Sequence, residues 1–163
     1  MRIVMQSEDA GRKHPVHWPA RERCNRAIIV FLTVCTAHRK AVLANGAAVA
    51  ALRGAWQQAD AWLVGRYVVM PDHLHLFCAP RVAGAPLKRW VQYWKSLASM
   101  RWPHPGDQPL WQKDFWDRQL RRGDSYAQKW DYVWRNPVRH DLVKQPEDWP
   151  WAGELNSLMW HDP

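Results

Sequence analysis

The stretch Y-V-V-M-P-D-H-L-H-L-F-C-A-P, residues 67–80, decides the fold and also points to the function. An apolar run leads into a Pro-Asp pair, which is typical of a turn, and a second apolar run follows. The pattern predicts a β-hairpin. His73 and His75 lie two residues apart in its second strand, so both imidazoles leave the same face of that strand. The intervening Leu74 then points to the opposite face, toward a core.

Imidazole is a common metal ligand and an acid–base group, and two of them at this spacing make half of a metal site. Many His-x-His pairs are incidental residues of a half-exposed strand. Here each histidine is followed by a leucine, which makes the opposite face of the strand part of the core. The histidine face must then be open or satisfied by polar partners, because buried polar groups without partners are costly.

The length of 163 residues and the hydrophobic fraction of 47% fit one globular domain with one core. No apolar run is long enough to span a bilayer, and residues 1–19 lack the apolar centre of a secretory signal. The three cysteines contain no C-x-x-C pair and suggest neither a disulfide framework nor a zinc ribbon. We therefore expect a cytoplasmic protein without a membrane partner.

The formal net charge of +8 favours a polyanionic partner, most simply nucleic acid. Thirteen tryptophans strengthen this expectation, because bases of single-stranded nucleic acid stack on flat aromatic side chains beside cations. Most of these tryptophans are expected in the core. Residues 1–25 are predicted to form an irregular basic arm, which either follows a phosphate backbone or is a solvated tail. The basic residues in and next to this arm are Arg2, Arg12, Lys13, Arg21, Arg23 and Arg26.

Hydrophobic periodicity predicts the element order β-α-β-β-α-β-α. The strands are expected at Arg26–Thr36, Trp62–Met70, Asp72–Ala79 and Phe115–Leu120, and the helices at Asn45–Asp60, Pro86–Trp102 and Tyr126–Arg135. The first six elements are those of a ferredoxin-like split β-α-β fold in the α+β class. A four-stranded antiparallel sheet would carry two helices on one face. The third helix, at the C-terminal end, completes the domain at 26–143, and residues 144–163 form a tail docked on it.

The third helix contains the second half of the candidate site. Tyr132 and Asn136 are four residues apart, so a phenol and a carboxamide project from one helix face. A tyrosine is able to act as a covalent nucleophile, and an amide oxygen suits a divalent ion beside two imidazoles. Taken alone, Tyr132 would be packing and Asn136 a helix terminator. Tyr126 is the competing nucleophile, but no amide follows it at four residues, and we interpret it as a packing residue.

Several segments carry a resemblance to a known family: T-V-C-T-A-H-R at 33–39, V-V-M-P-D-H-L-H-L at 68–76, F-W-D-R-Q-L-R at 115–121, Y-V-W-R-N-P-V-R at 132–139 and E-D-W-P-W at 147–151. They resemble the REP-associated tyrosine transposases, bacterial relatives of the insertion-sequence-200-like single-tyrosine transposases with a His-hydrophobic-His motif. The similarity runs from about Ile28 to Trp151. The chain departs from the common pattern at His140-Asp141, where Ala-Gly is frequent and glycine would ease a left-handed turn.

The resemblance implies a ferredoxin-like enzyme that cleaves and rejoins single-stranded DNA beside hairpins of repeated extragenic palindromes through a 5′-phosphotyrosine. It implies that Tyr132 is the nucleophile and that His73, His75 and Asn136 bind Mg or Mn. It leaves open whether the chain acts as a monomer or a homodimer.

Seven cations are the candidate DNA contacts, although each alone is an ordinary solvated charge: Arg39, Lys88, Arg89, Lys95, Arg118, Arg121 and Arg122. Two alternatives stay open at the level of sequence. A non-catalytic binder of structured DNA or RNA would use the same basic surface without Tyr132 or a metal. A small metal-dependent hydrolase would need carboxylate ligands, and Asp72 is the only acid beside the histidine pair.

Overall fold

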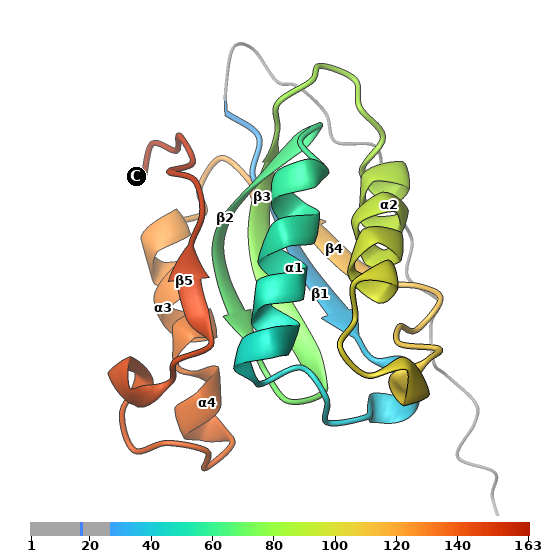
Figure 1. The fold of residues 1–163 in the computed structure, drawn as a ribbon. Helices are drawn as coiled ribbons and strands as arrows, with labels where there is room; N and C mark the ends of the chain where they lie inside the picture. The colour runs from blue at the N-terminus through green and yellow to red at the C-terminus, as the bar shows by residue number, and fades with distance from the viewer. Residues whose placement is uncertain (1–16, 18–26) are drawn as a thin grey trace, which may run out of the picture.

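A computed structural model describes residue 17 and residues 27–163. A five-stranded antiparallel sheet in the order β4-β1-β3-β2-β5 forms its centre (Figure 1). The strands are β1 (Val30–Cys35), β2 (Trp62–Val69), β3 (His73–Pro80), β4 (Trp116–Gln119) and β5 (Ala152–Glu154). The helices are α1 (Gly46–Gln58), α2 (Leu87–Met100), α3 (Tyr126–Trp134) and α4 (Asn136–Arg139), with short 3-10 turns η1 (Ala37–Arg39), η2 (Pro105–Asp107) and η3 (Pro146–Asp148).

The predicted ferredoxin-like fold class is confirmed, because β1-α1-β2-β3-α2-β4 has the order and antiparallel pairing of the split β-α-β unit. Polar side chains cap the N-termini of α1 and α3. The side chain of Asn45 accepts a hydrogen bond from the backbone N–H of Ala48 at 2.9 Å. Ser125 accepts one from Gln128 at 3.2 Å, so it is the cap of α3.

The alternation of side chains along the strands separates two cores. Leu32 and Leu76 pair across β1 and β3 and belong to the core beneath α1 and α2, which lie side by side on one face (Figure 1). Phe31 and Phe77 pair one position away, so they point to the opposite face. They pack there with residues of α3 in a second, smaller core. The helix with the predicted nucleophile therefore covers the face that carries the histidine pair.

The sheet has one strand more than the sequence predicted. The tail contributes β5, which pairs with the free edge of β2 from Arg66 to Val68. Trp149 anchors this segment by donating its indole N–H to the carbonyl of Val69 at 3.0 Å. β5 is three residues long, Ala-Gly-Glu, and has no β-branched residue. Its strand state depends on the unpaired edge that β2 offers, which no local pattern reveals.

The predicted third helix ends before Asn136-Pro137, as expected, but the chain does not leave the helical conformation there. The chain enters α4 at once, with Pro137 in its first turn, where a missing N–H costs no helical hydrogen bond. After α4, Asp141 adopts a left-handed conformation with φ of 54°. The turn that glycine would ease is therefore present here with aspartate, which tolerates this region better than most residues.

Tryptophans fill much of the main core, as predicted. Trp56, Trp62, Trp90 and Trp94 are buried, whereas Trp116 on β4 is 53% exposed. None of the helices in the described part of the chain is long and apolar enough to cross a membrane. The predicted arm at residues 1–25 lies outside the described residues except for His17, whose ring stacks on Phe115 with centroids 4.2 Å apart.

Candidate functional site

The two histidines of β3 lie together on the face of the sheet that α3 covers. Their ring centroids are 4.8 Å apart, and the ring planes are nearly perpendicular. His73 is buried and His75 is partly buried, while Leu74 and Leu76 are fully buried in the core on the other face. The hairpin places the pair as the sequence predicts, just after the turn at Pro71-Asp72.

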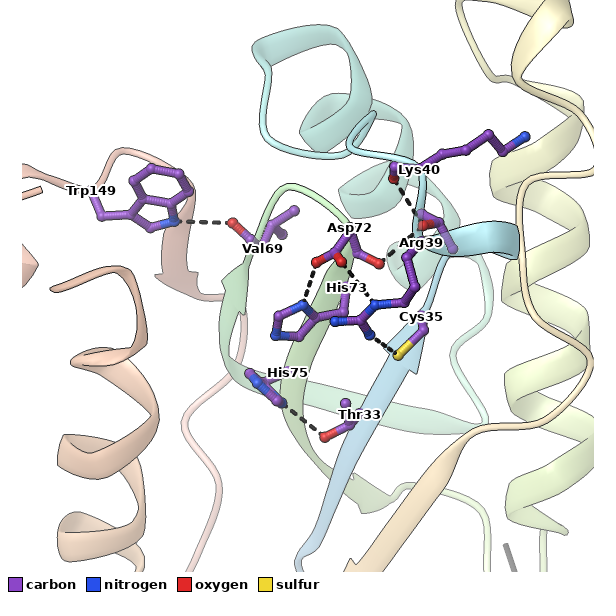
Figure 2. A network of polar contacts seen from close by, with 10 residues as sticks. Thr33, Cys35, Arg39, Lys40, Val69, Asp72, His73, His75 and Trp149 are labelled. Carbon is purple, nitrogen blue, oxygen red and sulfur yellow. Dashed lines mark hydrogen bonds and ion pairs between the residues drawn. The ribbon is translucent and has the colours of Figure 1, made fainter. Parts of the chain in front are cut away.

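Each imidazole uses its Nδ1 atom for a hydrogen bond (Figure 2). His73 Nδ1 is 2.7 Å from a carboxylate oxygen of Asp72, and His75 Nδ1 is 2.8 Å from the hydroxyl of Thr33. An ionised carboxylate only accepts hydrogen bonds, so His73 carries its proton on Nδ1. The Nε2 atom of His73 then presents a lone pair. His75 has the same arrangement when its Nδ1–H donates to Thr33.

Both rings are held neutral near pH 7. Burial lowers the pKa of His73, and the hydrogen bond and negative charge of Asp72 oppose that effect only in part. Burial, reinforced by the neighbouring His73 and Arg139, lowers the pKa of His75 to about 3. Neutral imidazole is the form that coordinates metal ions, so this environment suits ligands better than it suits acids.

Tyr132 and Asn136 meet His75 at one open pocket between α3 and the sheet. The pocket has a volume of about 630 Å³, and its floor includes Phe31 and Phe77. Tyr132 is 66% exposed, so the solvent and a substrate reach its ring. The structure thus brings together the residues that the sequence singled out on β3 and on α3–α4, although His73 lies beside this pocket rather than in its lining.

Arg139 is a residue of the site that sequence reasoning missed. Its guanidinium carbon lies 3.9 Å from the centre of the Tyr132 ring, and one of its nitrogens donates to Oδ1 of Asn136 at 2.8 Å. The same nitrogen also donates to the backbone carbonyl of Tyr132. The spacing was visible in N-P-V-R, because residues three apart share a helix face once α4 is known to continue past Pro137.

The turn η1 brings a second arginine to the site. His38 and Arg39 both adopt left-handed conformations, with φ of 55° and 54°. For residues other than glycine such conformations cost about 1–3 kcal/mol each, and they persist only where the surroundings enforce them. Here Arg39 Nε lies 2.8 Å from a carboxylate oxygen of Asp72, and a second guanidinium nitrogen lies 2.8 Å from Sγ of Cys35 (Figure 2).

Asp72 is ionised between its two partners. Burial alone would raise its pKa, but the hydrogen bond from His73 and the charge of Arg39 together outweigh burial and lower that pKa. The backbone of Asp72 is fixed as well, because its carbonyl accepts from the N–H of Thr36 at 3.0 Å. Burial raises the pKa of the Cys35 thiol, and the nearby Arg39 only partly offsets this.

The donor set fits a divalent ion in part. Among the described residues no group of three or more His, Cys, Asp and Glu side chains could hold a metal ion. The histidine pair therefore needs an oxygen ligand such as the amide of Asn136, whose Oδ1 is now bonded to Arg139. Two neutral imidazoles with orienting partners on Nδ1 are the arrangement that metal-ligating histidines use.

Five of the seven predicted DNA contacts form two exposed groups, which lie on different faces of the sheet. Arg118, Arg121 and Arg122 are exposed on β4 and on the loop that leads to α3, and Arg118 lines the pocket. Lys88 and Arg89 are exposed on α2, on the opposite face of the sheet.

Lys95 and Arg39 have other partners. Lys95 is buried and donates to the backbone carbonyl of Gln112 at 2.7 Å, so its prediction as a phosphate contact is wrong for this structure. Arg39 is half exposed, but it is paired with Asp72 rather than free. Tyr126 is buried against Phe77, in agreement with its interpretation as a packing residue.

Fold and site together define a class of protein: a ferredoxin-like sheet with a His-hydrophobic-His pair that faces a helix carrying an exposed tyrosine. A scan against models of known protein families gives no match. The REP-associated tyrosine transposase of Escherichia coli (strain K12) is 31% identical over 90 residues, which cover 55% of this chain and 52% of that protein. A Haemophilus influenzae (strain ATCC 51907 / DSM 11121 / KW20 / Rd) protein, named as a candidate member of the same kind, is 26% identical over 95 residues and covers 52% of this chain and 54% of its own length.

Solved structures of a transposase and of a candidate transposase are also similar to this chain. The structure of a REP-associated tyrosine transposase bound to a REP hairpin matches with a TM-score of 0.66 and 25% identity, over 81% of this chain and 79% of that chain. A candidate transposase from Deinococcus radiodurans matches with a TM-score of 0.51 and 21% identity over 69% of this chain and 95% of that one, which shows the fold alone. These matches confirm the resemblance inferred from the sequence. The chain spans about half the length of the curated relatives it matches.

Proposed function

We propose that this chain is a metal-dependent single-stranded DNA transposase or endonuclease that cleaves and rejoins DNA beside hairpin elements through a 5′-phosphotyrosine. The observation that carries the proposal is the meeting of Tyr132 and Asn136 with His75 at one pocket. Two similar proteins are named as transposases of this kind, and the similar solved structure holds a REP hairpin. Hairpin DNA with a flanking single strand is therefore the substrate that we propose.

The pocket suits a nucleotide and its phosphate. Its volume of about 630 Å³ lies in the range of small-molecule sites. Phe31 offers an aromatic surface for a base, and Arg118 offers a cation for a neighbouring phosphate. The exposed Tyr132 hydroxyl is then free to approach a phosphorus atom placed between α3 and His75.

In the chemical step the oxygen of Tyr132 attacks the scissile phosphorus in line and loses its proton to water. A bond forms between that oxygen and phosphorus, and the bond from phosphorus to the 3′ oxygen breaks. The 3′ oxygen takes a proton from water and leaves as a free hydroxyl. A different 3′-hydroxyl reverses the step and rejoins the strands, so the linkage to Tyr132 preserves the bond energy without a nucleotide cofactor.

His73, His75 and Asn136 are the residues that would hold Mg or Mn. Such an ion, when bound, would withdraw charge from the phosphate oxygens. Because imidazoles are softer donors than Mg usually prefers, Mn suits the pair well. Arg139 now donates to Oδ1 of Asn136 and would compete with such an ion for this oxygen; a DNA phosphate is a natural alternative partner for its guanidinium.

A labelled hairpin oligonucleotide with single-stranded flanks, incubated with the protein and Mn²⁺ and separated on a denaturing gel, tests the proposal. We expect a protein-linked DNA band with the unchanged chain and with Tyr126→Phe, and none with Tyr132→Phe. Hairpin binding by Tyr132→Phe should stay within about twofold, because the hydroxyl is not a phosphate-binding cation. Cleavage without a linked band would indicate a hydrolase, binding without any product would indicate a non-catalytic binder of structured nucleic acid, and a linked band with Tyr132→Phe would refute Tyr132 as nucleophile.

A further inference from the structure

The carboxylate of Asp72 interacts with a different residue through each of its two oxygens (Figure 2). One oxygen accepts from Nδ1 of His73 at 2.7 Å, and the other lies 2.8 Å from Nε of Arg39. The backbone carbonyl of the same residue accepts from the N–H of Thr36, and the Thr36 hydroxyl lies 3.0 Å from it. Asp72 therefore has little freedom to turn its carboxylate away from the histidine.

We propose that Asp72, anchored by Arg39, is a positioning residue that fixes His73 as the Nδ1–H tautomer and so aims its Nε2 lone pair at a divalent cation. This inference rests on the proposed function for the identity of the ligand, but the tautomer itself is a property of the metal-free protein. The resemblance and the comparisons assign no role to either residue. The sequence suggested Arg39 only as a DNA contact.

The geometry of η1 supports a dedicated anchor rather than a solvated surface arginine. Two consecutive left-handed residues, His38 and Arg39, turn the chain back toward the β2–β3 turn. The Thr36 hydroxyl lies 2.8 Å from the carbonyl of Lys40, which closes this loop on itself. An arginine that only carried surface charge would need neither conformation. The guanidinium instead lies between Asp72 and Cys35.

The chemistry of the pair decides what each partner does. An anionic carboxylate accepts and never donates, so it selects the ring proton on Nδ1 and leaves Nε2 without one. In the Nε2–H tautomer, the lone pair on Nδ1 would point at a lone pair of the carboxylate, which is repulsive. Carboxylates and carbonyls play this part beside metal-ligating histidines, where their loss typically weakens metal affinity by about 10–100-fold. Arg39 acts one step further out, by holding the carboxylate in place.

Two measurements on the full chain test the inference. Long-range ¹H–¹⁵N correlation spectra of the metal-free protein report which ring nitrogen of His73 carries the proton. Isothermal titration with Mn²⁺ reports affinity without any DNA or turnover. In the unchanged chain we expect the proton on Nδ1. In Asp72→Ala we expect a mixture of tautomers and about 10–100-fold weaker Mn²⁺ binding, and in Arg39→Gln a loss of a few-fold.

Asp60→Ala is the matched control, because it removes an aspartate from an exposed ion pair with Arg81. It should change neither the His73 tautomer nor the Mn²⁺ affinity. If Asp72→Ala does not fold, Asp72→Asn replaces it, because asparagine has nearly the same shape as aspartate. Its uncharged amide is able to donate as well as accept, so a detectable share of the Nε2–H tautomer of His73 is expected. A proton on Nε2 in the unchanged chain, or unaltered tautomer and Mn²⁺ affinity in both Asp72 variants, would overturn the inference. If the unchanged chain binds no Mn²⁺, the metal dependence in the proposed function is refuted. The ¹H–¹⁵N spectra then test by themselves whether Asp72 fixes the tautomer of His73.

Discussion

The hydroxyl of Thr33 lies 2.8 Å from Nδ1 of His75, directly across the β1–β3 pairing. The two ligand candidates are thus oriented by different partners, a neutral hydroxyl for His75 and an anion for His73. A hydroxyl both donates and accepts, so it permits either tautomer of His75, whereas a carboxylate selects one. The pair combines one strongly fixed ring with one that is able to adapt.

Replacing Thr33 by valine should weaken Mn²⁺ binding less than the loss of Asp72 does, by about two- to tenfold. The β-branched shape is preserved on the strand, so the free energy of unfolding should change by no more than about 1.5 kcal/mol, the value of one hydrogen bond. Calorimetric titration with Mn²⁺ and urea unfolding measure the two effects. Thr33→Ser keeps the hydroxyl and should restore the affinity. An affinity loss in the serine variant equal to that in the valine variant would contradict this role of the hydroxyl.

Replacing Arg139 by alanine should lower the Mn²⁺ concentration that gives half-maximal formation of the protein–DNA adduct by about three- to tenfold. The reason is that Arg139 now occupies Oδ1 of Asn136, the oxygen proposed as a metal ligand, with a charge-assisted hydrogen bond. A titration of adduct against Mn²⁺ measures the shift. Arg135→Ala is the control, because Arg135 on the neighbouring position bonds Asp131 instead. An unchanged or higher Mn²⁺ requirement in Arg139→Ala would count against competition for this oxygen.

The salt dependence of hairpin binding should separate two groups of cations. Substituting Arg118, Arg121 and Arg122 together removes charge beside the pocket, and should reduce the slope of log affinity against log salt by about 2, since each phosphate contact contributes about 0.7–0.9. Substituting Lys88 and Arg89 removes charge from the opposite face of the sheet and should leave the slope nearly unchanged. Fluorescence anisotropy at several salt concentrations gives both slopes. If the slope falls by the same amount per removed charge in the two groups, the face with the pocket is not the preferred DNA-binding face.

The sequence predicted most of what positions the site, because the local patterns there agree with the fold. The His-x-His alternation placed both rings on one face, and hydrophobic periodicity placed α1 and α3 close to their observed bounds. The approach of Tyr132 and Asn136 to His75 was inferred from the resemblance and from the chemistry, not from a local pattern. It depends on α3 packing against Phe77 and its neighbours, which is a tertiary contact.

What escaped prediction depends on contacts between distant segments or on a local conformation that the sequence pattern disfavours. β5 forms because β2 has a free edge, and Arg139 reaches Tyr132 because α4 continues past Pro137. Lys95 reads as a surface cation in the sequence, but its ammonium is buried against the carbonyl of Gln112. Arg39 reaches Asp72 only through two left-handed residues, which nothing in T-A-H-R-K announces. In each case the deciding partner lies far along the chain or the conformation is one that propensities disfavour.

The unchanged chain should lose stability at alkaline pH through Tyr126, and Tyr126→Phe should not show this loss. Burial raises the pKa of Tyr126 to about 12, and the nearby backbone and charge of Arg66 lower it only in part. The unfolded chain ionises this phenol near pH 10, so the folded state loses stability as the pH rises from 10 to 12, by about 3 kcal/mol at most. At neutral pH the variant should be as stable as the unchanged chain or slightly more so, because the buried hydroxyl lacks a hydrogen bond of normal geometry.

Urea unfolding at pH 8 and pH 11 measures this difference between the two proteins. Because other groups that titrate in this range are common to both chains, the change in the difference belongs to Tyr126. An identical pH dependence in the two proteins would show that the phenol of the folded chain ionises at its ordinary pKa.

Gly153→Ala should destabilise the docking of β5 on β2. A Cβ at Gly153 would lie 2.8 Å from the hydroxyl oxygen of Tyr67 and 3.1 Å from the ring carbon that bears it. The Tyr67 ring cannot give way, because it is buried, packs on Trp56 and accepts a hydrogen bond from Arg53 at 3.0 Å. The clash should cost about 1–3 kcal/mol, as overpacking usually does, and should appear in urea unfolding and as faster amide exchange at 152–155. Gly106→Ala, where an added Cβ meets nothing within 4 Å, should change stability by less than about 0.5 kcal/mol. Equal stability of the two variants would mean that the edge of β2 admits the tail without the close approach of Gly153 to Tyr67.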